Sequence, residues 1–188
     1  MQIFELFQAV FYWLDMAVAI GIVVIAIVLY KYELINKLTY ILFWIGIGMG
    51  FSFEIPIFLI TEIGPYPMLQ YLITPPYPFY ITIILHSMWD GGIFLMGLML
   101  IYRFCESPHF EKFNAQEFLI LVIWGQLQAI GIEMLGSFGG AWEYIPYPWN
   151  PPMFILFGHY FTIFIQIVWL IAPIIFYFIA LKLKQKLN

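Results

Sequence analysis

The chain has 188 residues, of which 64% are hydrophobic and 10% are charged, and its formal net charge is −4. Soluble domains are about half apolar and a quarter charged, so this chain could not cover its apolar surface in water. It carries no basic patch interleaved with aromatic residues, which excludes nucleic-acid binding. A single cysteine excludes an internal disulfide and a cysteine-based metal cage. The composition therefore predicts an integral, multi-pass membrane protein.

A membrane-spanning helix needs about 20 consecutive apolar residues. Five stretches meet this requirement, at residues 10–30, 39–60, 79–103, 117–138 and 153–181. They leave no room for a separate soluble domain. The sequence therefore predicts an all-α protein whose residues 1–188 form one transmembrane domain, a bundle of five helices.

The connections between the predicted spans differ in charge. All seven Lys and Arg residues follow the first, third or fifth span, so they lie on one side of the membrane. The positive-inside rule makes that side cytoplasmic, with the C-terminus there and the N-terminus extracytoplasmic. Charge alone does not decide between the plasma membrane and the endoplasmic reticulum. The opposite connections are rich in Pro, Tyr and Trp, which predicts either a lid at the membrane interface or an ordinary aromatic belt.

Ionisable side chains inside spans are costly and mark functional sites. Asp15 lies near the start of the first span, where we expect it to reach the lipid headgroups. Glu54 lies about six residues before the end of the second span. His86 and Asp90 are four residues apart and share one stripe of the third span. Glu133 lies about five residues before the end of the fourth span.

The predicted fifth span adds His159, Gln166 and Trp169, with spacing that places them on one stripe together with Thr162 and Pro173. Because consecutive spans alternate in direction, Glu54, His86, Asp90, Glu133 and His159 all fall in the extracytoplasmic half. At 1.5 Å per residue, they lie about 8–17 Å below that surface. The sequence therefore predicts a polar-lined cavity between the helices.

Several kinds of chemistry suit a cavity lined by these polar residues. Carboxyl and imidazole groups in one cavity suit general acid/base catalysis. The same groups suit a metal, with His86 and Asp90 as two ligands and Glu133 or His159 as a third. His86 and His159 also suit a haem as its two axial ligands. A further alternative is an accessory subunit whose polar layer only fixes helix packing. The spacing leaves these alternatives open.

The C-terminal half resembles a known family. The run from Gln166 to Pro173 is similar to the last helix of the sterol isomerases related to emopamil-binding protein, where an amide, a Trp and a Pro share one face. Gly125-Gln126 resembles a Gly-Gln pair of the family's fourth helix, and Glu54 falls at a position where the family has an acidic residue. Pro75-Pro76 resembles the related sigma-two receptor. The departures are Gln166, where the family has Asn, and Gly50, where the isomerase has His.

This resemblance, to the EXPERA superfamily, implies a cavity that binds a sterol-like or isoprenoid lipid and isomerises its double bond. Glu54, His86 and Asp90 are the catalytic candidates, and the substrate-binding candidates are Glu133, His159, Gln166 and Trp169. No cofactor is implied. In the alternative, a haem- or transition-metal-binding or accessory subunit of a membrane redox complex, the metal candidates are His86, Asp90, Glu133 and His159. The expected partner is a membrane lipid, with a homodimer or a larger membrane complex left open.

Overall fold

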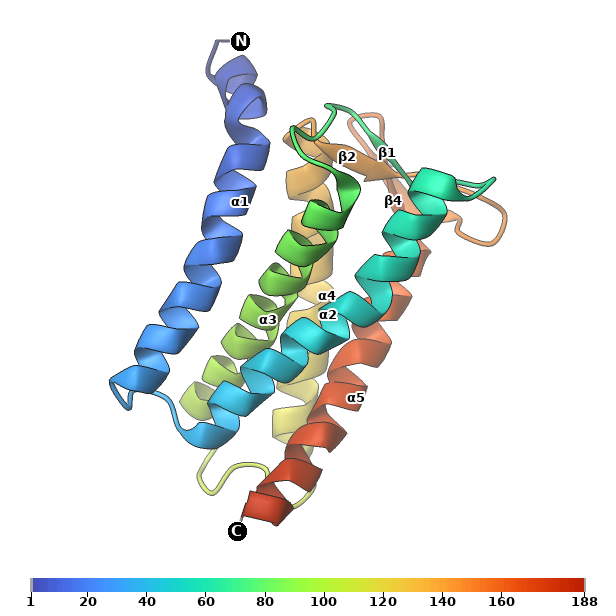
Figure 1. The fold of residues 1–188 in the computed structure, drawn as a ribbon. Coiled ribbons are helices and arrows are strands. Elements are labelled where there is room, and N and C mark those ends of the chain that lie inside the picture. The colour runs from blue at the N-terminus through green and yellow to red at the C-terminus, as the bar shows by residue number, and fades with distance from the viewer. Residues whose placement is uncertain (1, 188) are drawn as a thin grey trace.

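Five long helices make up most of the protein. The computed structural model describes residues 2–187, and the side chains of residues 10–187. Each helix in this part is long and apolar enough to cross a membrane, so the predicted multi-pass membrane bundle is confirmed. The helices are α1 (Gln2–Lys31), α2 (Lys37–Ile63), α3 (Phe79–Phe104), α4 (Ala115–Phe138) and α5 (Ile163–Leu187) (Figure 1).

The middle three helices begin and end within three residues of the predicted spans. Two of them start at asparagine caps. The side chain of Asn36 accepts a hydrogen bond from the Thr39 amide at 2.9 Å, and that of Asn114 accepts one from the Gln116 amide at 2.9 Å. Such caps satisfy amides that have no partner inside the helix, and thus fix where each helix begins.

Helix α3 occupies the centre of the bundle. It packs against α1, α2 and α4, while α5 packs against α4 and α2. Small residues bring α2 close to α3: a Cβ atom at Gly46 would lie 3.0 Å from Cδ2 of Phe94, and one at Gly50 would lie 2.9 Å from the Cα of Ser87. Glycines at these positions let the two backbones approach, as is common between membrane helices.

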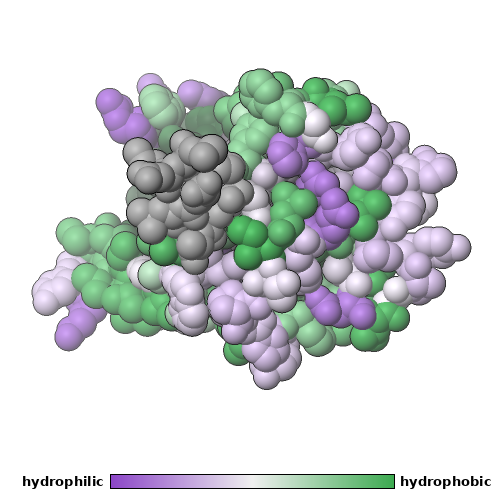
Figure 2. Space-filling view, turned by 90° about the horizontal axis from the view of Figure 1, so that it is seen from above, coloured by the Kyte–Doolittle hydropathy of each residue, from purple (hydrophilic) through white to green (hydrophobic). Residues whose placement is uncertain are grey.

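Four short strands, which the sequence did not predict, lie at the end of the bundle where α1 begins (Figure 1). Strand β1 (Leu69–Tyr71) pairs antiparallel with β2 (Trp142–Tyr144), and β3 (Pro152–Leu156) pairs antiparallel with β4 (His159–Thr162). The first sheet joins the two Pro- and Tyr-rich connections. Seen from this end, the surface combines hydrophobic and weakly hydrophilic residues with few strongly hydrophilic ones (Figure 2), as suits a membrane interface.

The predicted start of the fifth span is wrong. Residues 153–162 belong to the hairpin of β3 and β4, and α5 begins at Ile163 and continues to Leu187 rather than to residue 181. The hairpin turns at Phe157 and Gly158, with φ angles of 51° and 86°. A short apolar run has no periodicity that separates a strand from a helix, which explains the error. His159 and Thr162 consequently do not share a helix with Gln166.

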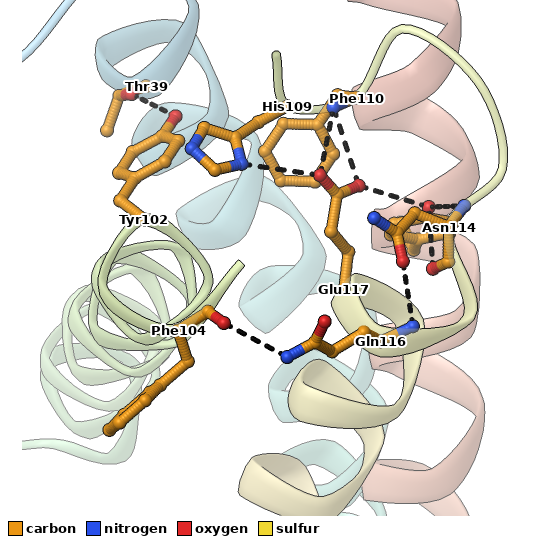
Figure 3. A network of polar contacts seen from close by, with 9 residues as sticks. Thr39, Tyr102, Phe104, His109, Phe110, Asn114, Gln116 and Glu117 are labelled. Carbon is orange, nitrogen blue, oxygen red and sulfur yellow. Dashed lines mark hydrogen bonds and ion pairs between the residues drawn. The ribbon is translucent and has the colours of Figure 1, made fainter. Parts of the chain in front are cut away.

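A buried carboxylate fixes the opposite end of the bundle (Figure 3). Glu117 is 1% exposed, and its oxygens accept hydrogen bonds from the Phe110 amide at 3.3 and 3.4 Å. The Tyr177 hydroxyl of α5 donates to it at 3.2 Å, and Nδ1 of His109 lies 3.4 Å away. The network ties the connection between α3 and α4 to α5.

Candidate functional site

A cavity of about 80 Å³ lies inside the bundle, below the sheet of β1 and β2. Every helix contributes to its wall, and β2 contributes Trp142 and Tyr144. The ionisable residues of the wall come from four different helices: Asp15, Glu54, His86, Asp90 and Glu133. The helices thus bring together acidic and imidazole groups that are far apart in the sequence.

The central pair is His86 of α3 and Glu54 of α2. Nδ1 of His86 lies 3.6 Å from Oε2 of Glu54, which is an ion-pair distance but too long for a direct hydrogen bond. The His86 ring contacts Phe58 and Trp142, with ring centroids 5.3 and 5.2 Å apart. Because aromatic rings hold the imidazole on two sides, its orientation toward Glu54 is fixed by packing.

Asp90 lies one helical turn from His86 on the same stripe of α3, as predicted for this spacing. Its side chain is next to Gly50, where a Cβ atom would collide with Oδ2 of Asp90. Asp90 is 5% exposed. Gly50 therefore provides the space that the Asp90 carboxyl occupies.

On the other side of the cavity, Glu133 of α4 meets α5. Nε2 of Gln166 donates a hydrogen bond to Oε2 of Glu133 at 3.3 Å. The backbone oxygen of Gln166 in turn accepts from Nε2 of Gln126 at 3.0 Å. Gln166 does not line the cavity itself, but it positions a carboxyl group that does.

Asp15 lies in the cavity wall, so the expectation that it reaches the headgroups is wrong. Its Oδ1 accepts a hydrogen bond from Nε1 of Trp89 at 2.8 Å. Trp89 belongs to α3, and the bond holds α1 against the centre of the bundle. The carboxyl group turns inward because a tryptophan donor of the neighbouring helix is within reach.

Aromatic rings form the rest of the wall. Trp142 of β2 packs on Gly136 of α4, where a Cβ atom would lie 2.6 Å from its ring. Trp169 of α5 is 4% exposed and contacts the rings of Phe53 and Phe94, with centroids 5.8 and 5.5 Å away. Two indole rings thus border a space that acidic groups and an imidazole also line.

Tyr144 is the hydroxyl-bearing residue of β2 in the wall. Burial raises the pKa of its hydroxyl well above the ordinary value, and the nearby Glu54, Glu133 and Asp90 act in the same direction. Tyr144 therefore keeps its proton and can donate a hydrogen bond at neutral pH.

Two buried atoms of the catalytic candidates have no hydrogen-bond partner among the described residues. They are Nε2 of His86 and Oδ2 of Asp90, both on α3. Buried polar atoms in native proteins nearly always bond to protein groups or ordered water, because an unpaired one costs about 1–3 kcal/mol. A water molecule or a polar ligand group bound in the cavity would provide the missing hydrogen bonds and remove this cost.

The predicted site residues divide into three groups. Glu54, His86, Asp90, Glu133 and Trp169 line the cavity, and Gln166 touches it through Glu133. His159 does not line it: its Nδ1 lies 2.9 Å from Oε2 of Glu143, at a separate pocket. Asp15, Trp89, Trp142 and Tyr144 are cavity residues that were not predicted as site residues. Among them, Asp15 stands out in the sequence as an ionisable residue inside the first predicted span.

The two histidines of the haem alternative face different carboxylates, His86 facing Glu54 and His159 facing Glu143. In the described part of the chain, no group of three or more His, Cys, Asp or Glu side chains is arranged to hold a metal ion.

No protein-family model, curated protein or solved structure matches the chain. Its likeness to the EXPERA superfamily therefore stays a prediction.

Proposed function

We propose that this membrane protein is an acid/base catalyst that moves a double bond in an isoprenoid or sterol-like lipid, as its resemblance to the EXPERA superfamily implies. The observation that carries the proposal is one cavity in which the Glu54–His86 pair and Asp90 face aromatic walls, with His86 Nε2 and Asp90 Oδ2 unpaired. Acid/base chemistry needs such donors and acceptors within reach of the reacting atoms.

The reaction consists of two proton transfers. A protonated carboxyl group, Asp90 or Glu54, adds a proton to one carbon of the double bond and leaves a carbocation on the other. A base, the His86–Glu54 pair or the Asp90 carboxylate, then removes a proton from the adjacent carbon. Protons balance, and neither an oxidant nor a reductant is needed. The indole faces of Trp142 and Trp169 favour the cation, each by up to about 2 kcal/mol when desolvated.

The size of the cavity limits what enters it. Ligand pockets for whole small molecules usually measure about 300–1,000 Å³, whereas this cavity measures about 80 Å³. We therefore propose that only the reacting segment of the lipid enters, and that the remainder extends toward the bilayer. Leu135 of α4 offers a route, because it lines the cavity and is 49% exposed on the bundle surface.

The sidedness of the site is part of the proposal. The structure places Lys31, Lys37, Arg103 and the Lys residues of the last turns of α5 toward the end of the bundle opposite the strands. By the positive-inside rule this end is cytoplasmic. The strands, the cavity and the N-terminus then belong to the extracytoplasmic half.

Native mass spectrometry of the gently purified protein tests the proposal without knowledge of the substrate. We expect a lipid-sized adduct on the wild type, and we expect that lipid to gain deuterium after incubation in D₂O, because reversible protonation exchanges its allylic hydrogens. Glu54→Gln and Asp90→Asn should abolish the gain. Leu127→Ala, at a side chain that is 62% exposed on α4, serves as a matched control and should retain it.

Two results would overturn the proposal. One is a chain without lipid, or with a lipid that gains no deuterium. The other is a haem or metal mass that disappears in His86→Ala, which would support the redox alternative instead.

A further inference from the structure

A second pocket, of about 580 Å³, lies outside the central cavity at the strand end of the bundle. It is bordered by the last residues of α4, the segment after β1 and the turn between β3 and β4. Its apolar wall comprises Leu72, Ile73, Phe138 and Phe157, and its polar side chains are Ser137 and His159. This volume falls within the usual range for ligand pockets.

The histidine of this pocket is held by a carboxylate. Nδ1 of His159 lies 2.9 Å from Oε2 of Glu143, and Nε2 of Gln70 donates a hydrogen bond to the other carboxylate oxygen. Both oxygens of Glu143 in β2 are thus engaged, one by Gln70 of β1 and the other by His159 of β4. A carboxylate that accepts from Nδ1 selects the tautomer whose proton is on Nδ1, which leaves Nε2 as an acceptor.

That acceptor is available to a ligand. Nε2 of His159 has no hydrogen-bond partner in the part of the chain that the structure describes, and the His159 side chain is 28% exposed. Its ring packs edge-on against Phe138, which also lines the pocket, with centroids 5.6 Å apart. Glu143 does not line the pocket, so it holds the ring from outside the wall.

We infer that this pocket binds a neutral lipid alcohol, whose hydroxyl group donates a hydrogen bond to Nε2 of His159. Its hydrocarbon part lies against Phe138, Phe157 and the Leu72–Ile73 segment. None of the side chains described along this wall is Lys or Arg. An anionic headgroup would thus meet no positive partner and would lie near the Glu143 carboxylate. A neutral hydroxyl group can donate a hydrogen bond to Nε2 of His159 without placing a negative charge near the Glu143 carboxylate. This site does not depend on the function proposed for the central cavity.

Photolabelling in phosphatidylcholine nanodiscs tests the inference. The probe is a long-chain alcohol with a diazirine in its chain and a terminal alkyne, and the matched probe is its O-methyl ether, which cannot donate a hydrogen bond. We expect the alcohol to label peptides that contain Leu72, Phe138 or Phe157. The ether should label them about tenfold less, since the lost bond to a carboxylate-polarised imidazole corresponds to roughly that factor.

Substitutions separate this site from the central cavity. His159→Phe keeps an aromatic ring in the wall and should lower labelling by the alcohol about tenfold, to the level of the ether. Glu54→Gln should leave labelling unchanged. Equal labelling of the wild type by alcohol and ether would overturn the inference, and this comparison does not depend on how any variant folds. Labelling that is unaffected by His159→Phe would overturn it too.

Discussion

Nδ1 of His86 and Oε2 of Glu54, which belong to neighbouring helices, lie 3.6 Å apart inside the bundle. Neither side chain has a Lys or Arg partner in the described part of the chain, so each is the other's counterion when the imidazole is protonated. Removing one member of a buried ion pair leaves the other buried in a medium of low dielectric with no opposite charge beside it. The pair should therefore behave as an energetic unit.

A double-mutant cycle tests this coupling. His86→Phe keeps the ring contacts with Phe58 and Trp142, and Glu54→Gln keeps the side-chain shape. We expect each single change to lower the free energy of unfolding in micelles by about 1–3 kcal/mol. The double variant should lose at least about 0.5 kcal/mol less than the two single losses combined. Strictly additive losses would mean that the two residues do not interact.

Gly50 and Gly48 provide a matched pair on α2. A Cβ atom at Gly50 would collide with the Asp90 carboxyl, whereas one at Gly48 would meet no described atom within 4 Å. Gly50→Ala should lower the free energy of unfolding by about 1–3 kcal/mol, because it overpacks the contact with α3. Gly48→Ala should leave it unchanged or raise it slightly. Thermal unfolding in the same detergent compares them, and equal midpoints would refute the close contact.

The hydrogen bond between Gln166 and Glu133 leads to a rescue experiment. Gln166→Leu removes a buried donor and should cost about 1–3 kcal/mol, because the Glu133 carboxyl loses that partner while it stays buried. Replacing both residues, in Gln166→Leu with Glu133→Leu, should recover most of this loss. Denaturant titration measures both variants. If the double variant is less stable than the single one, Glu133 has stabilising contacts that do not involve Gln166.

The buried Glu117 network at the other end of the bundle can be weakened by the removal of a single oxygen atom, the Tyr177 hydroxyl. Tyr177→Phe removes the hydroxyl that donates to Glu117 and accepts from the Asn114 amide at 2.8 Å. We expect a loss of about 1–3 kcal/mol in unfolding free energy. Phe178→Leu, at a neighbouring side chain that is 52% exposed, is the control and should cost less than about 0.5 kcal/mol.

Much of the cavity could be predicted by counting residues along apolar spans. The four-residue spacing of His86 and Asp90, and the positions of Glu54 and Glu133 in their spans, sufficed to place these side chains in the cavity. In a helix the rise per residue fixes the depth of a side chain, and the residue spacing fixes which face it lies on. Trp142 and Tyr144 could not be predicted, because they reach the cavity through a strand whose partners, Leu69 to Tyr71, are more than 70 positions away. His159 was misplaced because an apolar hairpin reads like the start of a helix.

The pairing of β1 with β2 also bears on how the protein is made. These strands flank α3 and α4 in the sequence, and their sheet lies at one end of the bundle. Chains fold from the N-terminal side during synthesis, so we expect the sheet to close only after α3 and α4 have both been made. On this expectation Trp142 and Tyr144 join the cavity wall after the helices that carry Asp15, Glu54 and Asp90 have been made. A nascent chain halted before β2 would lack Trp142 and Tyr144, so the cavity wall next to Asp15, Glu54 and Asp90 would be incomplete.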